Sequence, residues 1–192
     1  NGLHPQGQSL LPKTRVTIVT AELQGWGPSG GIGSAYGQLA EALAEAGHAV
    51  HVLLVAPGDQ QTNPLPQGVH LQRLDPSGLS RLELSRVVAA AVLQNPSDVV
   101  HLHDWLGLGS GLKQALGPDG PPLVVGLHGP SAWTRSGNPW PAEPDHAALY
   151  EEGLVRALEA DAIHHADLLV APSRFMASWV QQHLLGGAGS PK

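Results

Sequence analysis

Short apolar runs alternate with longer amphipathic segments along this chain. Six runs are apolar enough to be buried strands, and they cover residues 15–20, 49–55, 69–74, 98–103, 123–128 and 167–172. Helical spacing predicts helices over residues 79–94, 106–116 and 145–166, a first one between the glycine-rich stretch and Gly47, and a last one after Ser173. Strands that alternate with helices in this way predict a doubly wound, Rossmann-like parallel α/β sheet with helices on both faces.

The apolar positions also predict which face of each helix is buried. In the first helix they form a stripe of Ala35, Leu39, Ala42, Leu43 and Ala46. In the helix over 145–166 the stripe is Val155, Leu158, Ala162 and Ala166. Ser173 is expected to cap the last helix, which would bury Phe175, Met176, Trp179 and Val180. Residues 129–144 are expected to form a long loop.

Size and charge restrict the class of protein. The chain has 192 residues, 42% of them hydrophobic, which suits one core. We divide it into a loose arm (1–14), one domain (15–185) and a linker or cut end (186–192). The net charge of −6 and the lack of a Lys/Arg cluster make nucleic acid an unexpected partner. No run approaches the ~18 apolar residues of a membrane span, and no secretory signal is visible, so we expect a cytoplasmic protein.

The stretch Gly30-Gly31-Ile32-Gly33 lies between the first strand and the first helix. Glycines let backbone N–H groups approach a ligand, and a helix start favours an anion such as phosphate. Two familiar phosphate loops are excluded, because the stretch has no Lys and does not show the G-x-G-x-x-G spacing. The alternative is a glycine-rich turn that only lets the helix pack on the sheet.

Unusual residues follow the carboxyl ends of the strands, where open α/β sheets bind ligands. They are Trp26, His101, His103, Asp104, Trp105, His128, Gly129, Trp133, Trp140 and Ser173. The tryptophans either anchor loops or offer flat apolar faces to a sugar or base. His101 and His103 point the same way from one strand, so with His128 they could hold a metal, or backbone groups could satisfy them. Gly129 leaves room for a ligand beside His128.

Several of these motifs together resemble a known family. The glycine stretch, Gly47-His48 before a strand, the run from Asp98 to Trp105, the His128 strand end and the run from Ala166 to Ser173 stand in the same order as in the N-terminal domain of GT-B fold retaining glycosyltransferases. The match is greatest to family 4, and bacterial starch and glycogen synthases are more distantly similar. It covers roughly residues 15–185.

The resemblance implies roles for the matching residues. Gly30, Gly31, Ile32 and Gly33 would contact the donor diphosphate. His128 would lie against the donor sugar and support the positive charge that develops at its anomeric carbon. Asp104 would share the catalytic role near the acceptor cleft. The remaining cleft residues would be Trp26, His103, Trp105, Gly129, Trp133 and Ser173.

The resemblance also implies what is missing. Family members have a second Rossmann-like domain that binds most of the nucleotide sugar, so this chain is expected to be an acceptor-side half that is inactive alone. Ser29 and Ser34 stand where glycogen and starch synthases carry Lys and Asp, which argues against a glucan synthase that uses ADP-glucose. We expect a hexosyltransferase with nucleotide-sugar and acceptor substrates and no metal or other cofactor. The alternatives are a metal-dependent hydrolase using His101, His103, Asp104 and His128, and a non-catalytic sugar- or nucleotide-binding domain.

Overall fold

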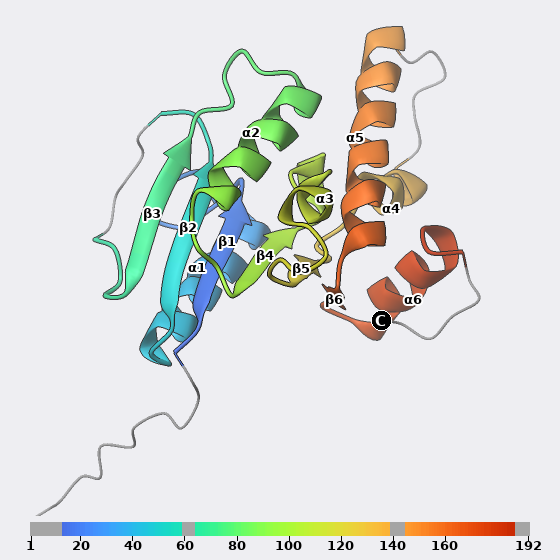
Figure 1. Cartoon of the computed structure of the whole chain (residues 1–192). Coiled ribbons are helices and arrows are strands. Elements are labelled where there is room, and N and C mark those ends of the chain that lie inside the picture. Colours follow the sequence, from blue (N-terminus) through green and yellow to red (C-terminus); the bar gives the residue numbers. More distant parts are fainter. Residues whose placement is uncertain (1–12, 59–63, 139–144, 187–192) are drawn as a thin grey trace, which may run out of the picture.

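The computed structural model describes residues 13–58, 64–138 and 145–186. Within them, six strands form one parallel sheet in the order β3-β2-β1-β4-β5-β6 (Figure 1). The strands are β1 (Arg15–Thr20), β2 (Ala49–Val55), β3 (Val69–Leu74), β4 (Val99–His103), β5 (Leu123–Gly126) and β6 (Leu168–Val170). The predicted doubly wound sheet is confirmed. The direction of strand order reverses between β1 and β4, and ligands bind at such a reversal in open sheets.

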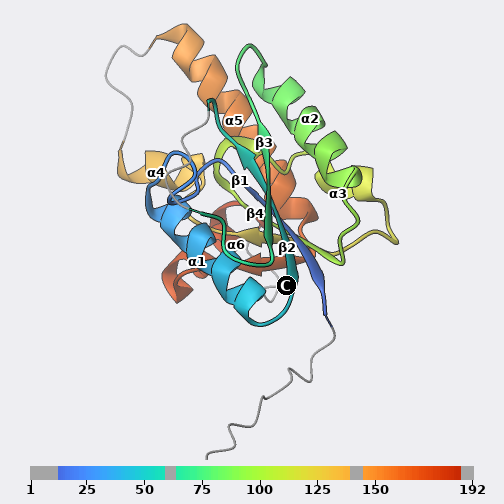
Figure 2. The same cartoon turned by 90° about the vertical axis from the view of Figure 1, so that its left-hand side faces the viewer.

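Helices cover both faces of the sheet. They are α1 (Gly31–Glu45), α2 (Arg81–Leu93), the short 3-10 helix η1 (Trp105–Gly107), α3 (Leu112–Leu116), α4 (Ser131–Gly137), α5 (His146–His165) and α6 (Arg174–His183). Figure 2 shows α1 on one side of the sheet and α2 and α3 on the other. Strand β1 is buried on both faces. Ile18 lies in the core on the α1 side of the sheet, and Val19 lies in the core on the other side. Burial on both faces explains why the predicted strands are apolar at nearly every position.

The buried stripe of α1 differs from the predicted one. Ala35, Ala42 and Ala46 are exposed, whereas Tyr36 and Ala40 are buried. Tyr36 is only 1% exposed, and its ring offers far more apolar area than any alanine, so its burial sets the rotation of the helix. The α5 stripe is confirmed, since Val155, Leu158 and Ala162 are buried and Ala166 is buried at the end of the helix.

Three local predictions were wrong. Residues 106–116 do not form one helix, because η1 ends at Gly107 and α3 begins after Gly111, and these two glycines adopt positive φ angles of 65° and 70°. The expected loop 129–144 contains helix α4, which begins directly after Pro130, a residue whose fixed φ favours a helix start. Phe175 is 69% exposed, because the buried stripe of α6 runs one position further on, through Met176 and Val180.

Candidate functional site

A pocket of about 300 Å³ opens at the carboxyl ends of β1, β4 and β5, and we call it the carboxyl-end pocket. It lies where the strand order reverses. Its lining residues come from the loops after these three strands and from the start of α1: Glu22, Gly31, Ile32, Trp105, His128 and Gly129. The fold therefore brings together the glycine stretch, Trp105 and His128, which are far apart in the sequence.

In this structure, backbone N–H groups of the glycine stretch bind a carboxylate from the same chain. Glu22 Oε2 accepts hydrogen bonds from the backbone N–H groups of Gly30 (2.7 Å) and Gly33 (3.1 Å). No side chain at Gly30 itself caps α1, so the carboxylate of Glu22 satisfies N–H groups at the helix start. Sequence reasoning missed Glu22, although an acidic residue directly after the first strand was a usable signal.

The three glycines serve different purposes. A Cβ at Gly30 would lie 2.9 Å from Glu22 Oε2, and one at Gly33 would lie 3.2 Å from Glu22 Cβ and 3.3 Å from the Leu23 nitrogen. These two positions let the loop after β1 approach the helix closely. Gly31 is different, because a Cβ there would meet nothing within 4 Å and would project into open space beside the pocket.

His128 forms part of the wall of the pocket and is exposed to solvent. Burial lowers the pKa of its imidazole, while the nearby negative charge of Glu22 acts in the opposite direction. The lowered pKa favours the neutral ring, in which one nitrogen donates a hydrogen bond and the other accepts one. Its backbone is fixed by Asp104, whose carboxylate accepts hydrogen bonds from the N–H groups of His128 (3.0 Å) and Gly129 (3.2 Å).

Asp104 was predicted as a catalytic acid, and the structure places its carboxylate on the backbone of the His128 loop. The residue is 0% exposed. Burial raises the pKa of its carboxyl group to about 6, and its hydrogen bonds to backbone N–H groups offset part of that rise. In this arrangement Asp104 acts on the pocket through the backbone of His128 and Gly129.

A layer of aromatic rings lies behind His128. The ring of Tyr36 is 5.4 Å from that of His128, 5.3 Å from His101 and 5.6 Å from His103, measured between centroids. Gly126 makes room for this layer, since a Cβ there would lie 2.9 Å from the Tyr36 hydroxyl and 3.3 Å from His128 Nε2. In the sequence, the only signal for Tyr36 was its place in an amphipathic helix.

His101 and His103 belong to this supporting layer. His103 Nε2 accepts a hydrogen bond from the Ala21 N–H group (3.0 Å). Burial, and secondarily the nearby His128, lower the pKa of His103 to about 3 and that of His101 to about 4. Across the described ranges, no three His, Asp or Glu side chains are placed to hold one metal ion. The metal-dependent alternative therefore finds no ligand set in this part of the chain.

The remaining predicted cleft residues lie at various distances from the pocket. Trp105 and Gly129 line it. Trp133 packs against Gly129, where a Cβ would lie 3.4 Å from its ring. Trp26 is buried in the core beside α1, and Ser173 caps α6 by accepting a hydrogen bond from the Met176 N–H group (3.1 Å). Trp140 lies outside the described residues.

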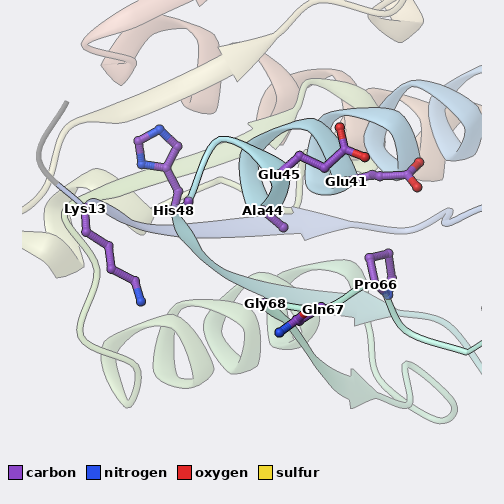
Figure 3. A pocket seen from close by; sticks show the side chains of 9 residues that line it. Lys13, Glu41, Ala44, Glu45, His48, Pro66, Gln67 and Gly68 are labelled. Atoms are coloured by element: carbon purple, nitrogen blue, oxygen red, sulfur yellow. The ribbon is translucent and has the colours of Figure 1, made fainter. Parts of the chain in front are cut away.

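A second hollow of about 590 Å³ lies at the opposite end of the sheet, and we call it the amino-end hollow (Figure 3). Its lining residues precede β1, β2 and β3 or end α1: Lys13, Glu41, Ala44, Glu45, Gly47, His48, Pro66, Gln67 and Gly68.

None of the helices in the described ranges is long and apolar enough to cross a membrane.

Comparison with known proteins identifies a family and a fold. A sequence model of Glycosyltransferase Family 4 matches residues 29–185. The structure is similar to sucrose-phosphate synthase from Thermosynechococcus elongatus, with 19% identity and a TM-score of 0.65 over 94% of this chain and 47% of that one. It is also similar to the catalytic domain of starch synthase IV from Arabidopsis thaliana bound to ADP and acarbose, with 18% identity and a TM-score of 0.52 over 64% of this chain and 35% of that one. No curated protein matches the chain. The chain thus spans about half or less of the length of these two structures.

Proposed function

Since this chain belongs to glycosyltransferase family 4, we propose that it forms the acceptor-side domain of a retaining hexosyltransferase that uses a nucleotide sugar. The observation that carries the proposal is the carboxyl-end pocket, which lies beside a pair of anion-binding N–H groups and is lined by His128 and Trp105. These are the groups that a sugar with an attached diphosphate requires: donors for the phosphates and a partly apolar wall for the sugar ring.

His128 would support the reacting carbon of the donor sugar. Retaining transfer develops positive charge at the anomeric carbon in the transition state, and a neutral imidazole can face that charge without repelling it. The downward shift of the His128 pKa fits this role, because a protonated ring would disfavour the same transition state. Asp104 would act as a positioning residue, since its carboxylate holds the backbone on both sides of the His128–Gly129 bond.

Glu22 would have to leave the glycine stretch when a diphosphate binds. Its carboxylate and the phosphate would compete for the N–H groups of Gly30 and Gly33, and both carry negative charge. Because Glu22 also lines the pocket and its charge already reaches His128, the released carboxylate would remain next to the sugar. This competition predicts weak binding of nucleotide sugars to the chain alone.

A second domain would complete the active site. Among the described residues, neither Lys nor Arg lines the pocket, so the diphosphate lacks a permanently charged basic partner there. We propose that a second Rossmann-like domain supplies that charge and closes the cleft against water, and that no bound metal is needed. This chain alone would then show no transfer and at most millimolar affinity, roughly −4 kcal/mol.

The test is a titration of the isotope-labelled chain with UDP-, GDP- and ADP-sugars, followed by NMR. We expect millimolar binding that shifts the amide signals of Gly31 to Gly33 and the ring signals of His128. In Gly31→Val the added side chain would enter the open space beside the pocket, so we expect about tenfold weaker binding with normal folding. The control is Gln67→Val, which places a valine in the amino-end hollow instead and should bind like wild type.

Three results would contradict the proposal. Shifts confined to the amino-end hollow would place the ligand at the wrong end of the sheet. Unchanged binding in folded Gly31→Val would show that the glycine stretch does not face the donor. Micromolar binding or turnover by this chain alone would overturn the assignment of a second, donor-binding domain.

A further inference from the structure

Glu159 is an acidic residue on the buried side of α5. It is only 1% exposed, and it lies four residues after Val155 and four before Ile163, inside the apolar stripe of the helix. Burying a carboxylate is unfavourable unless hydrogen bonds replace its water. Its place in the stripe is the signal that sequence reasoning overlooked, because an acid at such a position needs a buried partner.

The partners of Glu159 are backbone and hydroxyl groups of two loops. Oε2 accepts a hydrogen bond from the Ser131 N–H group (2.7 Å), and Oε1 accepts from the Ser131 hydroxyl (2.9 Å) and the Leu106 N–H group (3.2 Å). Leu106 directly follows Trp105, and Ser131 is three residues after His128. One carboxylate therefore connects the loop after β4 with the loop after β5, and these loops carry the two aromatic walls of the carboxyl-end pocket.

The loop after β4 needs such a contact, because its backbone is strained. Leu106 has φ 68° and ψ 0°, and it is the one non-glycine residue with positive φ in the described ranges. A branched side chain rarely adopts this conformation, and surrounding contacts must maintain it. Gly107 adds to the constraint, because its missing Cβ lets η1 pack directly against Leu158 of α5.

Asp104 completes the arrangement from the other side of the His128 loop. It holds the N–H groups of His128 and Gly129, while Glu159 holds that of Ser131. Two buried carboxylates thus bind three of the four residues from His128 to Ser131. Apolar side chains could fill this space at a lower cost in free energy than two buried carboxylates. Stability of the fold alone therefore does not explain why Asp104 and Glu159 are buried here.

We propose that Glu159 is a positioning residue that sets Trp105 and His128 at a fixed separation across the carboxyl-end pocket. The meaning of that separation for catalysis rests on the proposed function, but the contacts themselves do not. Glu159 reaches the pocket only through Leu106 and Ser131, so it touches no substrate. Its removal should alter both walls of the pocket at once, although neither wall belongs to α5.

Glu159→Gln tests the proposal in the 192-residue chain without ligand. Glutamine has nearly the same volume, but its NH₂ group cannot accept the hydrogen bonds that one carboxylate oxygen now accepts. The matched control is Asp161→Asn on the same helix. Asp161 Oδ2 also accepts hydrogen bonds from a hydroxyl and a backbone N–H group, those of Ser110 (2.9 Å) and Gly111 (2.8 Å), but neither residue lines the pocket.

The readouts are amide hydrogen exchange and the NMR signals of the two walls. In Glu159→Gln we expect the amides of Leu106 and Ser131 to exchange about tenfold faster or more, since each loses or weakens a bond to a charged acceptor. The indole signal of Trp105 and the pH titration of the His128 ring should both change. In Asp161→Asn faster exchange should be confined to Gly111, with Trp105 and His128 as in wild type.

Two further variants extend the test, and the first of them, Ser131→Ala, takes the place of Glu159→Gln if that variant folds poorly. Ser131→Ala removes one bond to Glu159 and should alter the His128 titration more than the Trp105 signal. Leu106→Gly relieves the strained turn and, combined with Glu159→Gln, should restore the Trp105 signal without restoring protection at Ser131.

The proposal is overturned if Glu159→Gln, or Ser131→Ala in its place, leaves the Trp105 and His128 signals unchanged. It is also overturned if Asp161→Asn changes them equally. These measurements need no donor or acceptor. The proposed function could therefore fail in the sugar titration while the positioning role of Glu159 stands, and the reverse outcome is equally distinguishable.

Discussion

The amino-end hollow is about twice as large as the carboxyl-end pocket, at about 590 Å³ against 300 Å³. Its charged side chains, Lys13, Glu41 and Glu45, stand in solvent (Figure 3). The smaller pocket is backed by buried polar groups whose pKa values are displaced, namely Asp104, His103 and Glu159. Such groups are unfavourable to bury and are typical of functional sites. Size alone would favour the amino-end hollow, whereas these displaced pKa values favour the carboxyl-end pocket.

The two ends also differ in how tightly the backbone is packed. Gly107, beside the carboxyl-end pocket, and Gly47, in the amino-end hollow, both have positive φ, at 65° and 91°. A Cβ at Gly107 would lie 2.3 Å from Leu158 Cβ, whereas one at Gly47 would meet nothing within 4 Å. The same substitution at the two glycines therefore separates crowding from backbone strain.

The largest expected effect follows from this pair. Gly107→Ala should lower the free energy of unfolding by roughly 4 kcal/mol, because overpacking adds to the strain of a positive φ. Gly47→Ala should cost only roughly 1 kcal/mol, since strain acts alone there. Urea unfolding monitored by circular dichroism measures both values. Equal losses in the two variants would mean that η1 is not pressed against α5.

The next effect concerns His128, which lines the carboxyl-end pocket, and His48, which lines the amino-end hollow. In an active enzyme that contains this domain, His128→Ala should reduce kcat and kcat/KM together by roughly 2–4 kcal/mol, because the contact strengthens only in the transition state. His48→Ala, in the amino-end hollow, is the matched control and should stay within about twofold. Steady-state kinetics of sugar transfer provide the measurement. If the His128→Ala enzyme is as active as the His48→Ala control, His128 has only a structural role.

The third effect is a dependence of stability on pH. Burial raises the pKa of Glu159 to about 7, with Asp104 adding to the rise, whereas an unfolded glutamate titrates near ~4.3. The folded state thus binds the proton of the Glu159 carboxyl group more tightly than the unfolded state does. The resulting stabilisation is present below about pH 4 and is lost as the pH rises through about 7.

Glu159→Gln cannot titrate at this position. The unfolding free energy of wild type minus that of Glu159→Gln should therefore fall by roughly 3 kcal/mol between pH 4.5 and 7.5. Urea unfolding of both proteins across this range gives the difference. A difference that stays constant, or that rises with pH, would show that Glu159 is not a buried acid with a raised pKa.

The sequence was sufficient for the fold and for the positions of the main motifs. Strands such as Ala49–Val55 are apolar at nearly every position, and glycine and proline mark their ends, so local pattern determines them. The cap at Ser173 and the buried face of α5 were equally readable. Because parallel strands end at one edge of a sheet, it also followed that Trp105, His128 and the glycine stretch would meet.

Only the tertiary structure decided how these residues are held. The carboxylate of Glu22 lies on Gly30 and Gly33 because the loop after β1 folds back over the start of α1. Glu159 reaches Leu106 and Ser131 across 53 and 28 residues of sequence. Periodicity describes neighbours within one element, whereas a buried carboxylate takes its partners from whichever loops the packed helices bring within hydrogen-bonding distance.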